Sequence, residues 1–147
     1  DFLRTAANTT REDDPNLDNI SFRFDVFEAF TEGYLTGGKS FLTPIEIENL
    51  PYAVALFPYM QAIRFLADYL NGDTYFKVQH PLHNLERTCN QFRLLECVEE
   101  ATPKMEAYIQ EKLAADRGGV HRNILFRFFP ICASIGSADG EIHFLSE

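Results

Sequence analysis

Apolar residues at helical spacing dominate the middle of the chain and leave few architectures open. They recur every three or four positions, at Tyr52, Leu56, Met60, Ile63, Ala67 and Leu70. This period is typical of one face of an α-helix and predicts a helix from Pro51 that ends at Asn71-Gly72. Pro58 lies inside the run and should kink the helix, because proline removes a backbone donor and crowds the preceding turn.

The longest apolar stretch, residues 52–63, contains a proline and is shorter than the roughly 20 residues that a membrane span needs. It therefore predicts a buried helix and no membrane partner. The 147 residues are enough for one domain. Thirteen Lys and Arg against 22 Asp and Glu give a net charge of −9, which disfavours binding to nucleic acid or anionic lipid. The three cysteines form no C-x-x-C pair, which is typical of free thiols in a reducing, cytoplasmic compartment.

Further helices are predicted on both sides of this run. After a polar opening that is read as a short helix or coil, a helix from Phe24 ends at Gly37-Gly38 and carries Phe27, Phe30 and Tyr34 on one face. The segment Thr43-Pro44-Ile45-Glu46 has the pattern of a capping box with proline at the first helical position. It predicts a short helix that ends near Leu50.

The second half is expected to contain two more helices. One runs from Pro81 or Leu82 to Ala101, and its predicted buried stripe consists of Leu85, Cys89, Phe92 and Leu95. Thr102-Pro103 repeats the cap-and-proline signal and predicts a separate last helix, with Met105, Ile109 and Leu113 on its inner face. Between the long helices, residues 74–78 alternate like a short extended segment. The fold class is therefore mainly α, a bundle of about five helices.

Residues 1–113 form the predicted helical unit, and residues 114–147 form a tail of a different kind. Gly118-Gly119 breaks the helical pattern, residues 124–135 are apolar with a strand-like bias, and residues 137–140 resemble a turn. Either a short hairpin or a poorly ordered appendage fits this tail. Because the chain starts at Asp1 without a methionine, we expect a cleaved, truncated or partial chain.

Two short motifs admit a functional and an ordinary interpretation. The segment from Gly33 to Ser40 matches the phosphate-loop expression G-x-x-x-x-G-K-[ST], but helical residues precede it and the next capped helix starts only at Thr43. We therefore interpret it as a helix end with an exposed lysine. His80 and His83 are close enough in sequence to share a metal, but no second cluster completes four ligands, so surface histidines are the expectation.

A charged pair stands out in the apolar central helix. Arg64 and Asp68 are one turn apart, so they form either a structural ion pair or a clamp for a ligand. Tyr75 follows the helix and could bring a ring toward the same region. Arginine offers several donors in a fixed geometry, and an aromatic ring suits the apolar face of a sugar.

Four segments resemble one known family. They are FDVFEAFTEGYL from residue 24, LTPIEIENLP from residue 42, RFLADYLNGDTYFKV from residue 64 and HNLERTCNQFRLLECVE from residue 83. Together they resemble the C-terminal helical part of the aminoglycoside phosphotransferase superfamily, which is protein-kinase-like, and within it the N-acetylhexosamine 1-kinases. The opening segment DFLRT also resembles this family, so the resemblance runs from Asp1 to about Leu113, most of the chain, in the expected order, and the tail matches nothing in it.

The resemblance implies a kinase-like fold of which this chain supplies the C-terminal subdomain. The family uses ATP and magnesium to phosphorylate the anomeric hydroxyl of an amino sugar, and Arg64, Tyr75 and Thr5 match positions that contact the sugar. The chain has no H-x-D-x-x-x-x-N catalytic loop, so no catalytic, cofactor-binding or metal residue is assigned to it. We therefore expect walls of an acceptor pocket, the reactive lobes upstream, and no activity or bound ATP in the fragment alone.

Two other functions remain open. The chain could be a free-standing acidic helical interaction module, because 14% of its residues are aromatic and its acidic face would select a basic partner. It could also be a phosphate-loop nucleotidase if the segment from Gly33 to Ser40 binds nucleotide.

If the chain is a lobe separated from the rest of a kinase, it should expose the apolar surface that it normally buries, and it should therefore self-associate.

Overall fold

A computed structural model describes residues 1–38 and 40–117. These residues form five α-helices and one short 3-10 helix, and none of them forms a strand. The elements are α1 (Phe2–Ala7), η1 (Leu17–Asn19), α2 (Phe24–Gly38), α3 (Pro44–Glu48), α4 (Leu50–Leu70) and α5 (His83–Arg117). The prediction of a mainly α chain is confirmed.

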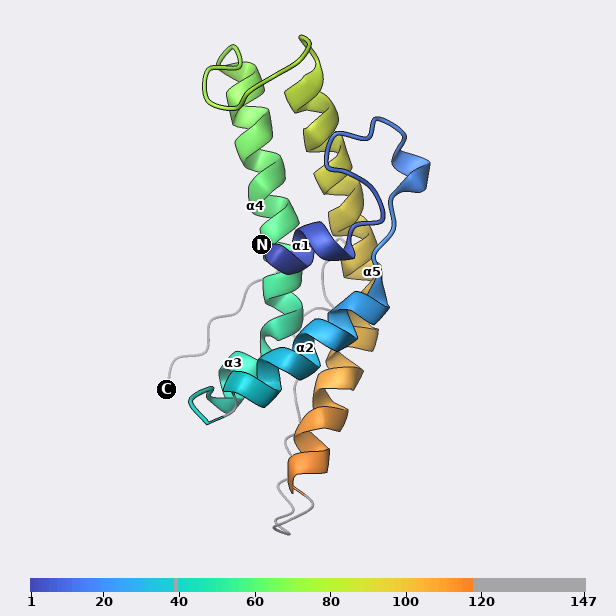
Figure 1. Cartoon of the computed structure of the whole chain (residues 1–147), viewed down its shortest axis with the longest axis vertical. Coiled ribbons are helices and arrows are strands. Elements are labelled where there is room, and N and C mark those ends of the chain that lie inside the picture. The colour runs from blue at the N-terminus through green and yellow to red at the C-terminus, as the bar shows by residue number, and fades with distance from the viewer. Residues whose placement is uncertain (39, 118–147) are drawn as a thin grey trace, which may run out of the picture.

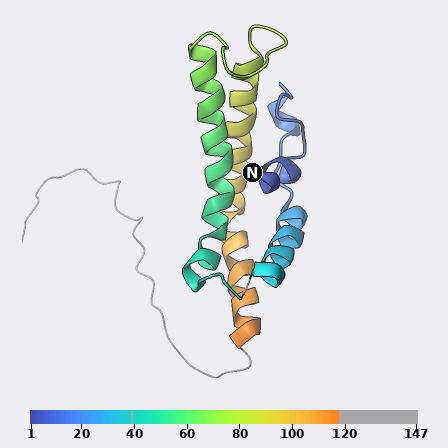
Figure 2. The same ribbon diagram turned by 60° about the vertical axis from the view of Figure 1, so that its left-hand side comes forward.

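The long helices α4 and α5 run antiparallel and side by side, and the loop of residues 71–82 joins them at one end (Figure 1). The segment from α1 to α2 lies along one side of this pair (Figure 2). Apolar residues from α1 to α5 meet in one core, in which Phe27, Met105 and Ile109 are almost completely buried. The core therefore joins the early helices to the distal half of α5.

Local capping signals are confirmed at both ends of the α3–α4 region. The Thr43 hydroxyl accepts from the Glu46 amide at 3.4 Å, and the Glu46 carboxylate accepts from the Thr43 amide at 2.8 Å. α4 ends at Leu70 and is capped by Asn71, as predicted. These features involve residues that are adjacent in sequence, which is why the sequence predicts them correctly.

The predicted break at Thr102-Pro103 is wrong, because α5 runs without interruption through Pro103. The apolar residues before and after it share one helical period, and a single straight helix buries Leu94, Val98, Met105 and Ile109 in the same core. The Thr102 hydroxyl donates to the Val98 carbonyl at 3.0 Å, a bond typical of threonine inside a helix. Tertiary burial therefore outweighs the local proline signal.

Replacing Pro103 by alanine should stabilise the protein. Pro103 is exposed within α5, so the change restores a helical hydrogen bond without leaving a cavity. The roughly 3 kcal/mol difference in helix propensity is offset in part by the greater entropy of the unfolded chain, which leaves a gain of about 1–2 kcal/mol. Urea denaturation followed by circular dichroism measures it. Unchanged or lower stability would mean that the proline ring itself packs favourably.

The faces that the helices bury differ from the predicted ones. The whole predicted stripe of α4 is exposed: Tyr52, Leu56, Met60, Ile63, Ala67 and Leu70. The opposite side of α4 is buried instead, with Val54, Ala62 and Phe65. Because α4 is apolar around most of its circumference, periodicity alone could not identify the side that meets α5. We call the six exposed residues the outer face of α4.

The predicted inner faces of α2 and α5 need similar corrections. In α2, Phe27 is buried but Phe30 and Tyr34 are exposed. In α5, Cys89 is exposed, and the rest of its predicted stripe is only half-buried. The distal residues Met105 and Ile109 are buried as predicted.

The proximal half of α5 is packed largely with polar side chains. Asn90 is completely buried, accepts from the Asn8 amide at 3.1 Å and donates to the carbonyls of Arg11 at 2.9 Å and Asp14 at 3.2 Å. Gln91 accepts from Arg4 at 2.9 Å. We call these contacts between residues 4–14 and α5 the polar seam. No apolar periodicity signals them, so the sequence analysis missed the seam.

Some predictions fall outside the described residues. The hairpin or disordered tail lies in residues 118–147, and α5 itself continues past the predicted boundary at residue 113 to Arg117. Residues 74–78 form bends and irregular backbone in place of the predicted extended segment. Cys89 and Cys97 are free, and Cys97 is buried. Within the described ranges, no helix combines the length and apolarity that crossing a bilayer requires.

Candidate functional site

The candidate site is built around the sharp turn that follows α4. Asn71 ends the helix, and Gly72 and Asp73 then adopt positive φ angles of 84° and 57°. Only glycine takes this conformation freely, although aspartate tolerates it better than most residues. The turn sends residues 74–76 back along the side of α4, beside Arg64 and Asp68.

Asp68 holds these returning residues. One carboxylate oxygen accepts from the backbone amides of Thr74 at 3.0 Å and Tyr75 at 2.8 Å, and the other accepts from the Phe76 amide at 2.9 Å. Burial alone raises the pKa of Asp68, but the amides of Phe76, Tyr75 and Thr74 together outweigh it and hold the pKa below its ordinary value. Both carboxylate oxygens are thus engaged, and the structural ion pair with Arg64, one of the two alternatives for this charged pair, is not formed.

Asn84, in the first turn of α5, closes the loop from the other side. It is completely buried, and its amide nitrogen donates to Asp68 and to Asp73, both at 2.8 Å. Its carbonyl oxygen accepts from Arg87 at 3.1 Å. A single carboxamide therefore bridges two carboxylates that would otherwise repel each other.

Arg64 is exposed and lies against two aromatic rings. Its guanidinium carbon is 5.8 Å from the Tyr75 ring centroid and 5.4 Å from that of Phe76, within cation–π range. The buried side chain of Gln61 accepts from Arg64 at 3.2 Å. No described carboxylate pairs with Arg64, so its charge is directed to solvent or to a ligand.

Phe76 ties this arrangement to the interior. Its ring lies 4.7 Å from that of Phe65, which is buried between α4 and α5, while Tyr75 is 73% exposed. We call the surface formed by Arg64, Tyr75 and Phe76 the Arg64–Tyr75 platform. It offers guanidinium donors, a phenol and one exposed ring, that of Tyr75.

Thr5, the third residue of the sequence prediction, lies elsewhere. It is exposed in α1 and lines a cavity of about 310 Å³ together with Arg4, Asn8, Thr10, Arg11, Glu12, Asp13 and Arg87. Neither Arg64 nor Tyr75 lines this cavity. The structure therefore brings two of the three predicted residues together and places Thr5 apart from them.

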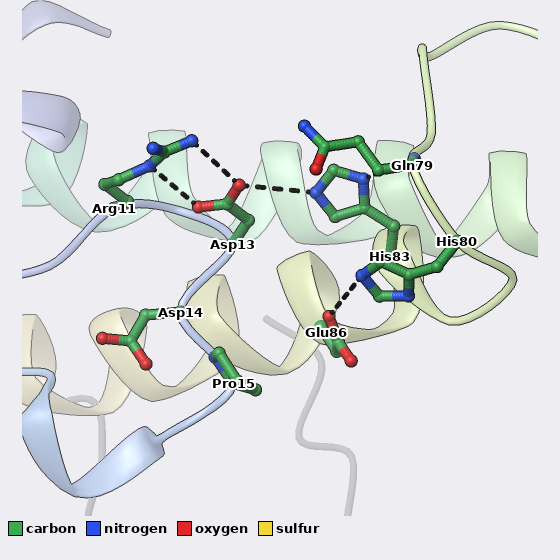
Figure 3. A pocket seen from close by; sticks show the side chains of 8 residues that line it. All are labelled: Arg11, Asp13, Asp14, Pro15, Gln79, His80, His83 and Glu86. Atoms are coloured by element: carbon green, nitrogen blue, oxygen red, sulfur yellow. Dashed lines mark hydrogen bonds and ion pairs between the residues drawn. The ribbon is translucent and has the colours of Figure 1, made fainter.

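A second cavity of about 560 Å³ contains the two histidines (Figure 3). His83 is buried, so the expectation of a surface residue is wrong for it: its Nδ1 accepts from the Gln79 amide at 3.1 Å, and its Nε2 lies 3.5 Å from Asp13. His80 is exposed and pairs with Glu86 at 3.2 Å. Among the described residues, no group of three or more His, Cys, Asp or Glu side chains could hold a metal. Both ring nitrogens of His83 have partners within the protein, so we interpret His83 as a structural residue.

The phosphate-loop string is helical from Gly33 to Gly38, and Ser40 lies in a turn. Residues 33–38 belong to α2, which ends at Gly38, and the next helix starts at Pro44. Lys39 lies outside the described residues. The interpretation of Gly37-Gly38 as a helix end is therefore confirmed, and no helix N-terminus follows directly to cradle a phosphate.

Sequence reasoning named Arg64, Asp68 and Tyr75 but missed the partners of Asp68, which are the loop amides and Asn84. A carboxylate at Asp68, just before the Asn71-Gly72 turn, is a usable signal for capping of loop amides, whereas nothing local indicates Asn84. The platform provides donors and aromatic surface but no acid–base pair. Among models of known protein families, none matches this chain.

Proposed function

We propose that this chain is the acceptor-binding part of an ATP-dependent small-molecule kinase, whose substrate is an amino sugar such as an N-acetylhexosamine phosphorylated at its anomeric hydroxyl. The observation that carries the proposal is the Arg64–Tyr75 platform: an arginine without a described carboxylate partner, within cation–π range of an exposed tyrosine ring. Planar guanidinium donors suit hydroxyl and amide oxygens, and an aromatic ring suits the apolar face of a sugar.

The phosphoryl chemistry belongs to parts that this chain does not contribute. The sequence lacks a catalytic-loop motif, and the described residues include no group of three or more His, Cys, Asp or Glu side chains that could hold a metal ion. The chain would bind and orient the acceptor, while upstream lobes of the same cytoplasmic enzyme would supply the nucleotide site and the base. Alone, it would be inactive.

The exposed apolar residues on the outer face of α4 favour the proposal that this chain packs against other parts of a larger enzyme. Tyr52 is 64% exposed and Leu70 is 74% exposed, and the apolar residues between them continue the same surface. Contiguous apolar surface of this kind is typical of an interface. We assign it to the upstream lobes of the enzyme. The same face would also suit the alternative, a free-standing interaction module with a protein partner.

Changing Arg64 to alanine tests the proposal in the protein extended to its upstream reading frame. With N-acetylglucosamine and N-acetylgalactosamine as acceptors in a coupled ATP assay, kcat/KM should fall at least about tenfold, because a charge-assisted hydrogen bond to the acceptor is lost. Arg23→Ala is the matched control, because Arg23 is an exposed arginine paired with Asp25 away from the platform.

Two results would contradict the proposal. If Arg64→Ala has the same kcat/KM as the control, the platform does not bind the acceptor. If the extended protein phosphorylates neither sugar but a partner protein binds through the outer face of α4, the interaction module is the better description. A double variant, Leu56→Ser with Met60→Ser, would then abolish that binding, whereas Arg64→Ala would leave it intact.

A further inference from the structure

We propose that Asp68 and Asn84 are positioning residues, which hold the backbone of residues 74–76 so that Tyr75 and Phe76 face Arg64. The part of this inference that concerns acceptor binding rests on the proposed function. Its structural part, the dependence of the platform on these two buried side chains, can be tested without any substrate.

The geometry links the holding group directly to the residues that are held. The amides of Thr74, Tyr75 and Phe76 donate to the Asp68 carboxylate over 2.8–3.0 Å. Two of these residues carry the rings against Arg64. Bonds from backbone amides to an ionised carboxylate are stronger than bonds between neutral groups, and they fix the backbone from which the rings project. The backbone from which the rings project therefore cannot move away from Arg64 without breaking bonds to Asp68.

Asn84 holds the Asp68 carboxylate in place, where it accepts from the loop amides. Its amide nitrogen keeps Asp68 and Asp73 close together, although both are negatively charged. Arg87, which donates to the Asn84 carbonyl, is the charged group that meets the cluster from α5, and Asp73 is the one that meets it from the loop. Asn84 comes from α5 while Asp68 comes from α4, so the platform depends on the pairing of the two long helices.

Amide exchange and NMR titration of the 147-residue chain test the structural part. Asp68→Asn should accelerate hydrogen exchange of the Tyr75 and Phe76 amides at least about tenfold, because a charged acceptor becomes neutral and loses one oxygen. Asp25→Asn, the same change at an exposed residue, is the control and should leave both rates unchanged. Equal rates in Asp68→Asn and the control would overturn the inference.

The pH dependence gives a second readout. The pKa of Asp68 is lowered in the folded chain, so the stabilisation that it provides is complete above the ordinary carboxyl value of about 3.9 and is lost as the pH falls through the folded-state pKa. The amide resonances of residues 74–76 should therefore shift together below about pH 3.9. They should not shift together in Asp68→Asn. Independent titration of the three amides would contradict the inference.

Kinetics of the extended enzyme test the functional part. Asp68→Asn and Asn84→Ala should each raise the KM for N-acetylglucosamine about tenfold while kcat changes less than about twofold, because binding geometry is lost and the reactive lobes are untouched. If amide exchange accelerates but KM does not change, the positioning role in acceptor binding is wrong. If Arg64→Ala also leaves KM unchanged, the proposed function fails, and exchange alone then decides the structural claim.

Discussion

Replacing Phe27 by alanine should lower the free energy of unfolding by about 3–5 kcal/mol, the cost of truncating a buried phenylalanine. Phe27 is completely buried, and its ring lies 5.5 Å from that of Phe24 and 5.9 Å from that of Tyr108. The side chain therefore joins α2 to the distal half of α5. Urea denaturation monitored by far-ultraviolet circular dichroism measures the loss.

Phe30→Ala in the same helix is the control, because Phe30 is 37% exposed. Its effect should stay below about 1 kcal/mol. Equal losses in the two variants would mean that α2 is not anchored through Phe27, and that the described core is wrong at its centre.

Changing Asn90 to alanine should have the second largest effect. Asn90 is buried, and its amide satisfies the carbonyls of Arg11 and Asp14. Removing the side chain leaves these acceptors without their partner, at a cost of about 2–3 kcal/mol. Stability measured in urea should fall by this amount, and amides in residues 8–14 should exchange faster.

The exposed Asn19 provides the comparison, since Asn19→Ala makes the same chemical change outside the seam. It should alter stability by less than about 0.5 kcal/mol. If Asn90→Ala matched it, the polar seam would contribute nothing measurable to the attachment of residues 4–14.

The elements that could be predicted from the sequence are those that depend on neighbouring residues. The Thr43–Glu46 capping box and the end of α4 at Asn71 are local, and both were predicted correctly. The buried side of α4 was not, because apolar residues cover most of that helix and only contact with α5 selects a side. The predicted break at Pro103 is wrong for a related reason, because burial of Met105 and Ile109 in the core outweighs the local proline signal.

The candidate site shows the same division. Arg64 and Tyr75 could be named because their side chains have unusual chemistry for their position, and the structure places them together. The loop amides that bind Asp68 are signalled by its place just before the Asn71-Gly72 turn, whereas its other partner, Asn84, lies on another helix and no local pattern indicates it. Thr5, named from a resemblance alone, lies apart from both.

The polar seam has a consequence for how the chain acquires its structure during synthesis. Arg4 and Asn8 meet Gln91 and Asn90, partners that are 87 and 82 positions later. The residues of α1 are therefore synthesised long before these partners exist, and in the interval water forms hydrogen bonds with their polar groups. α4 and α5 are consecutive and can pair as soon as both have emerged. Within the described residues, the polar seam can therefore form only after Asn90 and Gln91 have been translated.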